Sequence, residues 1–194
     1  MLTLENLETW LTLFDEKIHQ HRDYLSELDT AIGDGDHGNN MVRGTEAVMA
    51  ALQEKQPETV ADMLKLVAMS LIGKVGGASG PLYGTAFLEM AKIANSTDNL
   101  AELLQAGLEG IQKRGKAVPQ DKTMVDVWFP VVEAAKADAL TEQTIWDAAE
   151  ATKPLVAKKG RASYLGERSA GHLDPGAVSS AYLFSALLEA GAVQ

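Results

Sequence analysis

Apolar residues recur along most of the chain at alternating steps of three and four positions. Such steps place the side chains on one face of an α-helix. In the first segment the pattern is unbroken, which predicts one long N-terminal helix. Its stripe consists of Leu4, Leu7, Leu11, Phe14, Ile18, His21, Leu25 and Leu28.

The same period returns in seven further segments, and no run of useful length alternates as a half-buried strand does. We therefore predict an all-α protein of about eight helices with essentially no sheet. The seven segments are 42–52, 60–71, 82–93, 100–111, 125–132, 145–156 and 178–188.

Residues typical of helix ends support these segments. Asp174 followed by Pro175 predicts an N-cap and a first helical position. Ser79 to Pro81, Thr141 and Asp121 also indicate helix starts. Glycines lie where preceding helices should stop, at Gly73, Gly115 and Gly160.

Glycine is concentrated in four segments between predicted helices: 33–38, 73–84, 110–115 and 160–176. In an up-and-down bundle, alternate loops lie at the same end. We therefore expect these four loops to share one surface.

Composition restricts the functional classes. A chain of 194 residues with 46% hydrophobic residues fits one globular domain spanning 1–194. The net charge of −10 argues against nucleic acid as a partner. Without cysteine there is no disulfide or zinc–thiolate site. No window resembles a signal peptide or a membrane span, so we expect no membrane partner and a cytoplasmic location.

The segment ELDTAIGDGDHGNNM, residues 27–41, places Asp29, Asp34 and Asp36 among glycines. Carboxylate oxygens without cysteine suit Mg²⁺, which is usually held by a few carboxylates together with substrate phosphates. Glycines also expose backbone N–H groups that bind phosphate oxygens. The simpler alternative is that Asp34 and Asp36 only cap a turn.

Other templates fit this segment poorly. Its G-x-G-x-x-G pattern follows a predicted helix, whereas a dinucleotide fingerprint follows a strand. An EF-hand loop starting at Asp34 would need Glu at its twelfth position, which is Thr45. A D-x-D nucleophile would need a buried strand upstream, and the sequence has no P-loop.

Two further loops carry features suited to anions. Ala78 and Ser79 precede Pro81 at a predicted helix N-terminus, which attracts anions, although simple capping is the alternative. Residues 158–176 hold the basic concentration of this acidic chain. The negative end of a helix dipole explains its two lysines, but it explains Arg161 and Arg168 less well. The planar guanidinium of arginine is suited to binding phosphate. His172, in the same loop, is a weaker candidate.

Four motifs together resemble the dihydroxyacetone kinase L family: IGDGDHGNNM, KVGGASGPLYG, RGKA with DKTMVD, and KGRASYLGERSAGHLDPGA. They cover the chain from about residue 25 to the C-terminus in the family's order. The resemblance implies an eight-helix antiparallel up-and-down barrel that holds ADP at one end through two Mg²⁺ ions.

The resemblance also implies roles for particular residues. Asp29, Asp34 and Asp36 would be the metal ligands, and no residue of this chain would act as a catalytic nucleophile. Asn39 departs from the alanine more frequent in the family. The expected nucleotide contacts are His37, Gly38, Asn39, Asn40, Ala78 and Ser79 at the phosphates and ribose, Gly115 and Met124 at the adenine, and Arg161, Asp174, Pro175 and Gly176 closing the site.

By the same resemblance the chain is the ADP-binding subunit of a phosphotransferase-dependent dihydroxyacetone kinase. A phosphohistidine on an M subunit would phosphorylate the tightly bound ADP. The ATP formed would then phosphorylate dihydroxyacetone on a K subunit. The oligomeric state stays open, with a homodimer among the options.

Four alternatives remain open at this point. Two are parts of longer chains: the unit of an ATP-exchanging dihydroxyacetone kinase and the nucleotide-binding part of a fatty-acid kinase. The third is a non-catalytic module in which ADP and Mg²⁺ regulate a partner. The fourth, a purely structural bundle, leaves the loop motifs unexplained.

Overall fold

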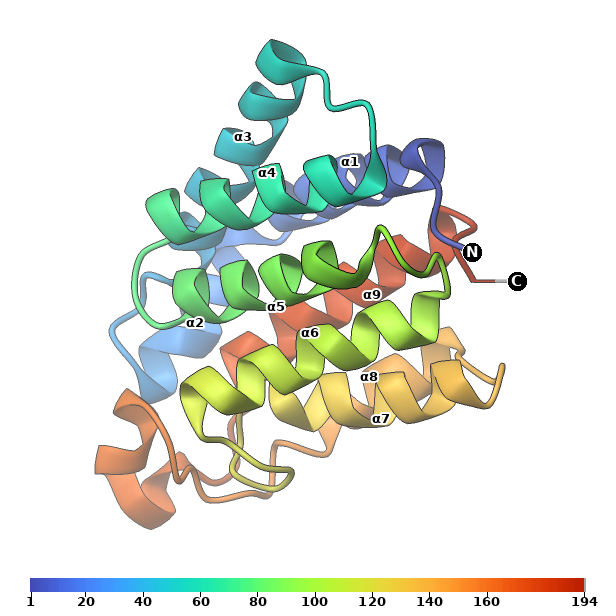
Figure 1. Cartoon of the computed structure of the whole chain (residues 1–194). Helices are drawn as coiled ribbons and strands as arrows, with labels where there is room; N and C mark the ends of the chain where they lie inside the picture. Colours follow the sequence, from blue (N-terminus) through green and yellow to red (C-terminus); the bar gives the residue numbers. More distant parts are fainter. Residues whose placement is uncertain (194) are drawn as a thin grey trace.

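The computed structural model describes residues 1–193, and all regular structure in that range is helical (Figure 1). This confirms the all-α prediction. The elements are α1 (Leu4–Gln20), α2 (Arg22–Ile32), α3 (His37–Lys55), α4 (Val60–Lys74), α5 (Ser79–Ile93), α6 (Leu100–Gly115), α7 (Val125–Lys136), α8 (Glu142–Glu150), the 3₁₀ segment η1 (Arg161–Ser169) and α9 (Pro175–Glu189).

The helices form a closed ring of neighbours. Each helix from α3 to α8 packs against the next, α8 packs against α9, and α1 packs against both α9 and α3. The η1 segment lies at one end of the molecule, and both termini lie near the opposite end (Figure 1). Among the described residues, no helix is both long and apolar enough to cross a membrane.

The predicted first helix is broken in two at His21, so the described chain has nine α-helices instead of eight. His21 leaves the helical region with φ −109° and ψ 15°. Its ring stacks on Tyr182 of α9, with centroids 4.4 Å apart and planes 9° apart. The apolar stripe continues through the break, and α2 also packs against α9. The change of direction therefore follows from a tertiary contact that the helical period does not show.

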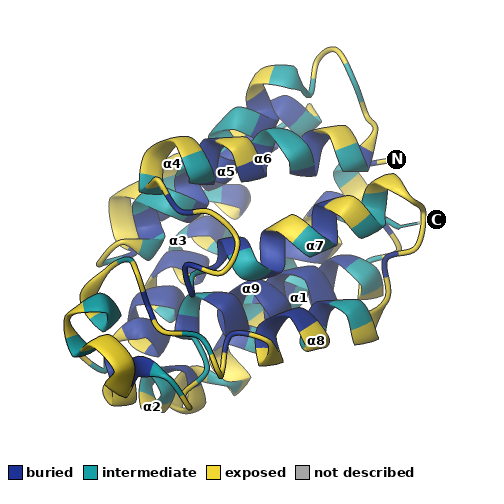
Figure 2. Cartoon of the chain, turned by 90° about the horizontal axis from the view of Figure 1, so that it is seen from below, coloured by how far each residue is buried: buried dark blue, intermediate teal, exposed yellow. Residues whose placement is uncertain are grey.

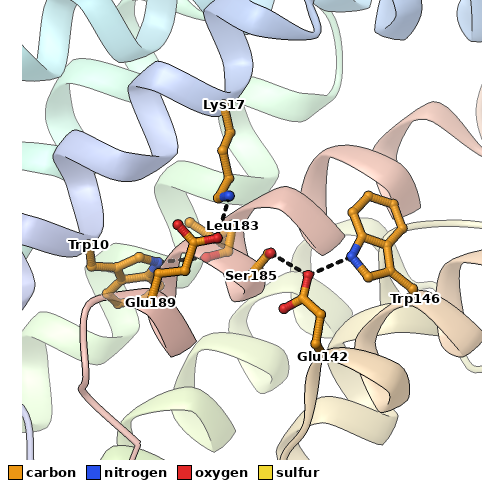
Figure 3. A network of polar contacts seen from close by, with 7 residues as sticks. All are labelled: Trp10, Lys17, Glu142, Trp146, Leu183, Ser185 and Glu189. Atoms are coloured by element: carbon orange, nitrogen blue, oxygen red, sulfur yellow. Dashed lines mark hydrogen bonds and ion pairs between the residues drawn. The ribbon is translucent and has the colours of Figure 1, made fainter.

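Helix α9 is buried along nearly its whole length, while most other helices expose one face (Figure 2). A helix that is apolar on all sides is expected to lie in the interior. Its backbone carbonyl at Leu183 accepts a hydrogen bond of 2.7 Å from the indole of Trp10. Near the same part of α9, Ser185 contacts Glu142 of α8 (Figure 3).

Most of the predicted helix boundaries hold, but two do not. Asp174 and Thr141 are N-caps as predicted, and α5 begins at Ser79. Asp121 is not an N-cap: its carboxylate accepts from the Val118 amide, and α7 begins at Val125.

The helix predicted over 145–156 ends instead at Glu150, and Gly160 therefore does not stop it. Pro154 explains the early end. Proline has no amide proton to donate to the carbonyl four residues earlier, and it disfavours helical backbone at the preceding residue.

Candidate metal and anion site

The loops at one end of the ring surround a cavity of about 450 Å³, a volume typical of small-molecule sites. All four glycine-rich segments contribute to its lining, which confirms that they share a surface. The cavity is also lined by the first residues of four helices, α3, α5, α7 and α9: His37, Ser79, Val125 and Pro175. Because a helix N-terminus carries partial positive charge and free N–H groups, this arrangement favours an anion.

Three carboxylates gather at one side of this cavity. Asp29 lies in the last turn of α2, and Asp34 and Asp36 lie in the loop before α3. One oxygen from each lies within 4.8 Å of the others. The Asp29 carboxylate also accepts hydrogen bonds from the amides of Asp36, at 2.9 Å, and His37, at 3.2 Å. This set of clustered hard oxygen donors fits Mg²⁺.

Glycine is required in the turn that carries these carboxylates. A Cβ on Gly33 would lie 2.0 Å from Oδ1 of Asp29. Gly35 has a φ of +77°, and a Cβ there would lie 2.7 Å from the Thr30 hydroxyl oxygen. The turn can therefore bring Asp34 and Asp36 beside Asp29 only because these side chains are missing.

Positive side chains from other segments also line the cavity. The guanidinium of Arg161, the first residue of η1, pairs with the Asp34 carboxylate across 127 positions of sequence. Arg114 and Lys159 line the cavity as well. Carboxylates that could hold a metal ion and an arginine that could bind a phosphate thus lie in one place.

His37 and Asn40 present polar groups from the first turn of α3. The His37 ring bonds to Ser179 through Nε2, at 2.9 Å, and to Ser79 through Nδ1, at 3.3 Å. Burial lowers the pKa of His37 to about 4, against a smaller opposing effect of Asp36. The side-chain carbonyl oxygen of Asn40 accepts from Arg43 at 3.0 Å, and Asn40 also lines the cavity.

The rest of the lining is largely apolar. Leu82, Ile111 and Val125 line it together with Ala117 and the buried side chain of Met124. A cavity with charged groups at one side and an apolar wall suits a ligand with a polyphosphate and a flat aromatic base.

Asp174 lies at the N-terminus of α9, where its carboxylate accepts from the Ala177 amide at 2.8 Å. Burial raises the pKa of Asp174 to about 7, helped by the negative charges of Asp126 and Asp29. The hydrogen bond from Ala177 opposes this rise. The carboxyl group therefore titrates near neutrality in the protein without ligand.

Thirteen of the fifteen residues predicted for the site line the cavity, and the other two do not. Gly38 is buried against α2, where a Cβ would lie 1.9 Å from the Arg22 carbonyl oxygen. Asn39 is exposed on α3. His172 is exposed and does not line the cavity. The close packing against α2 explains why residue 38 is glycine, and the nucleotide contacts of Gly38 and Asn39 both stay predictions.

Sequence reasoning missed Lys122, a residue that lines the cavity although only 1% of it is exposed. Its three ammonium N–H groups are shared among four backbone carbonyls within hydrogen-bond distance, which belong to Lys153, Leu155, Ser169 and His172. The partners lie 31 to 50 positions away, so no local pattern indicates them. Lys122 ties the loop before α7 to both ends of the long segment before α9.

Known proteins match this chain over most of its length. Residues 31–189 match the DAK2 domain family. The ADP-binding subunit DhaL of PTS-dependent dihydroxyacetone kinase from Lactococcus lactis is 53% identical over 189 residues, covering 97% of this chain and 98% of that protein. The ADP-binding subunit DhaL of PEP-dependent dihydroxyacetone kinase 1 from Listeria innocua is 53% identical over 184 residues, covering 93% of each.

A solved structure shares the fold. The dihydroxyacetone kinase from C. freundii in complex with AMP-PNP and Mg²⁺ superposes with a TM-score of 0.77 at 26% identity. The match covers 97% of this chain but 35% of that kinase, so the chain spans about a third of its length. Together with the sequence match over residues 31–189, this shows that the chain belongs to the DAK2 domain family.

Proposed function

We propose that the chain is the ADP-binding subunit of a phosphotransferase-dependent dihydroxyacetone kinase. The observation that carries the proposal is the cavity, in which the cluster of Asp29, Asp34 and Asp36 shares one space with four helix N-termini and an apolar wall. The two relatives of nearly equal length have this role in their names.

Bound ADP with two Mg²⁺ ions would accept a phosphoryl group from a phosphohistidine M subunit and pass it to dihydroxyacetone on a K subunit. The three carboxylates and a diphosphate together carry about −6 and two Mg²⁺ ions carry +4. Arg161 and the helix N-termini lie where they can offset the remaining charge.

The residues of this chain would position the nucleotide and neutralise the charge of its phosphates, which is most of what phosphoryl transfer requires of a protein. Asp29, Asp34 and Asp36 would hold the metal ions, and Ser79 with Asn40 would bind phosphate oxygens. Leu82 and its apolar neighbours, with Gly115 and Met124, would enclose the adenine. No nucleophile of this chain is needed, because the phosphoryl group arrives on one partner and leaves on the other.

The proposal extends to the organisation of the chain and its surroundings. We treat residues 1–194 as one domain, because one cluster of buried residues runs from Leu2 to Ala192. The K and M subunits are its partners. We place the assembly in the cytoplasm, together with its K and M partners and its triose substrate.

Tightly held nucleotide gives the first test. The protein is purified without added nucleotide and denatured, and the supernatant is analysed by chromatography. We expect near-stoichiometric ADP, which a strong Mg²⁺ chelator releases from the folded protein. Protein that is empty and that also fails to bind added ADP with Mg²⁺ would contradict the proposal.

Reconstitution gives the second test. The chain is mixed with K and M subunits, dihydroxyacetone and a source of phosphohistidine, and dihydroxyacetone phosphate is measured. We expect product that depends on this chain. Binding of ADP without any product would indicate a regulatory module instead of a kinase subunit.

A further inference from the structure

A continuous chain of hydrogen bonds runs from the protein core toward the cavity. It begins at the indole of Trp128 on α7, which donates to the Ser180 hydroxyl of α9 at 3.2 Å. Ser180 bonds to the Tyr83 hydroxyl of α5 at 2.8 Å, and Tyr83 bonds to Ser179 at 2.7 Å. All four residues are fully buried, so bulk solvent does not reach this part of the chain.

The second half of the chain reaches the cavity. Ser179 bonds to Nε2 of His37 at 2.9 Å, and Nδ1 of the same ring bonds to the Ser79 hydroxyl at 3.3 Å. His37 and Ser79 both line the cavity, at the N-termini of α3 and α5. The chain thus links a core tryptophan to a serine that lines the ligand space.

The first donor sets the direction of the core half. An indole N–H donates and never accepts, and a hydroxyl has one proton to donate. Ser180 accepts from Trp128, and the Tyr83 oxygen is the other hydrogen-bond partner of its hydroxyl among the described residues, so donation to Tyr83 is what gives the Ser180 proton an acceptor. Tyr83 then has two acceptors, Ser179 at 2.7 Å and the Gly176 carbonyl at 3.4 Å. The shorter bond favours donation to Ser179.

The same comparison applies at the next step. The Ser179 proton has a choice between Nε2 of His37, at 2.9 Å, and the Gly176 carbonyl, at 3.2 Å. Donation to the ring is again the shorter bond. In this direction Nε2 accepts from Ser179, and the ring proton lies on Nδ1 and is donated to Ser79. The Ser79 proton is left for a group in the cavity.

We propose that Trp128, Ser180, Tyr83 and Ser179 are positioning residues that hold His37 in its Nδ1–H form and thereby make the Ser79 hydroxyl a hydrogen-bond donor to an anionic ligand oxygen. In the opposite direction, the Ser79 proton would point at His37. Only oxygen lone pairs would then face the ligand, and they would repel a phosphate. The identity of the ligand as ADP rests on the proposed function, but the direction of the chain does not.

Nuclear magnetic resonance tests the direction without any ligand. The protein is stripped of nucleotide with a chelator and labelled with ¹⁵N, and long-range proton–nitrogen spectra of the histidine rings are recorded. The His37 signals are assigned by their loss in His37→Gln. We expect a protonated Nδ1 and an unprotonated Nε2. A protonated Nε2 would overturn the proposal.

A double-mutant cycle tests the effect on the ligand. Calorimetry measures ADP affinity in the presence of Mg²⁺ for wild type, Tyr83→Phe, Ser79→Ala and the double variant. Hydrogen bonds to charged groups are worth enough that we expect Ser79→Ala to weaken binding roughly tenfold or more. Tyr83→Phe should weaken it by roughly threefold to tenfold in wild type and have no further effect beside Ser79→Ala.

Purely structural damage would behave differently. Tyr83→Phe would then weaken binding equally with and without the Ser79 hydroxyl, and such additivity would overturn the proposal. If Tyr83→Phe does not fold, Ser180→Ala takes its place in the same cycle. It removes the bond between Ser180 and Tyr83, and the change in the side chain is small.

Ser185→Ala is the matched control. Ser185 is also a buried serine of α9, but its hydroxyl bonds to Glu142 of α8, outside the chain of bonds (Figure 3). We expect this variant to keep the wild-type ADP affinity and His37 spectrum. A wild type that binds no ADP would contradict the proposed function alone, since the spectrum of the ligand-free protein still decides the direction of the chain.

Discussion

In a Lys122→Met variant the buried ammonium group is lost, while a flexible side chain of similar length remains. Lys122 has a φ of +61°, and methionine at this position has the same backbone strain, so the strain does not contribute to the difference in stability. What changes is the set of four carbonyls that accept from the ammonium nitrogen. The variant therefore isolates the contribution of this group to holding the loops around the cavity.

The magnitude follows from which carbonyls can find water instead. Lys153 and His172 are exposed residues, and their carbonyls can be hydrated after a small movement. Ser169 is fully buried and Leu155 is half-buried. Two orphaned carbonyls cost about 1–3 kcal/mol each. Burial lowers the pKa of Lys122, which means that burying its charge is unfavourable. Removing the charge therefore offsets part of the free energy lost with the hydrogen bonds. We expect a net loss of about 2–4 kcal/mol, or roughly 4–16 °C in Tm.

Thermal and urea unfolding followed by circular dichroism measure this loss. Lys136→Met is the control, because Lys136 pairs with Glu133 on the surface of α7 at 2.7 Å and both side chains are about half exposed. Such a pair contributes less than about 1 kcal/mol. If Lys122→Met unfolds together with Lys136→Met, the ammonium does not hold the loops and the reasoning is wrong.

Three further predictions concern the same end of the molecule. Asp34→Asn and Asp36→Asn should each lose Mg²⁺-dependent ADP retention but keep the helical circular dichroism; retention in both would exclude them as metal ligands. Gly38→Ala should lower the free energy of unfolding by about 1–3 kcal/mol in urea titrations, because the added Cβ would lie 1.9 Å from the Arg22 carbonyl oxygen. The pKa of Asp174 is raised to about 7, so the folded ligand-free protein binds the proton more tightly than the unfolded chain. The contribution of Asp174 to stability should therefore fall as pH rises from about 4 to 7. The lowered pKa of His37 has the opposite effect below about pH 6.5, so the prediction concerns the difference in Tm between wild type and Asp174→Asn, which keeps the cap. This difference should fall over that pH range.

The sequence alone determined the features that depend on neighbouring residues. The helical period, the N-caps at Thr141 and Asp174, and the glycine-rich turn around Asp34 and Asp36 each arise within one or two helical turns. The four loop motifs also indicated the family and the shared surface of the loops. Such features follow from local backbone preferences and capping chemistry, which the order of residues states directly.

Only the tertiary structure decided the contacts between distant segments. The break at His21 depends on Tyr182, 161 positions later. The burial of Lys122 depends on carbonyls at least 31 positions away. The chain from Trp128 to Ser79 exists because α3, α5, α7 and α9 begin around one cavity. Periodicity shows which face of a helix is buried, but it does not show which polar groups of other segments contact that face. Those contacts determine the hydrogen-bond directions in the site and hold its loops in place.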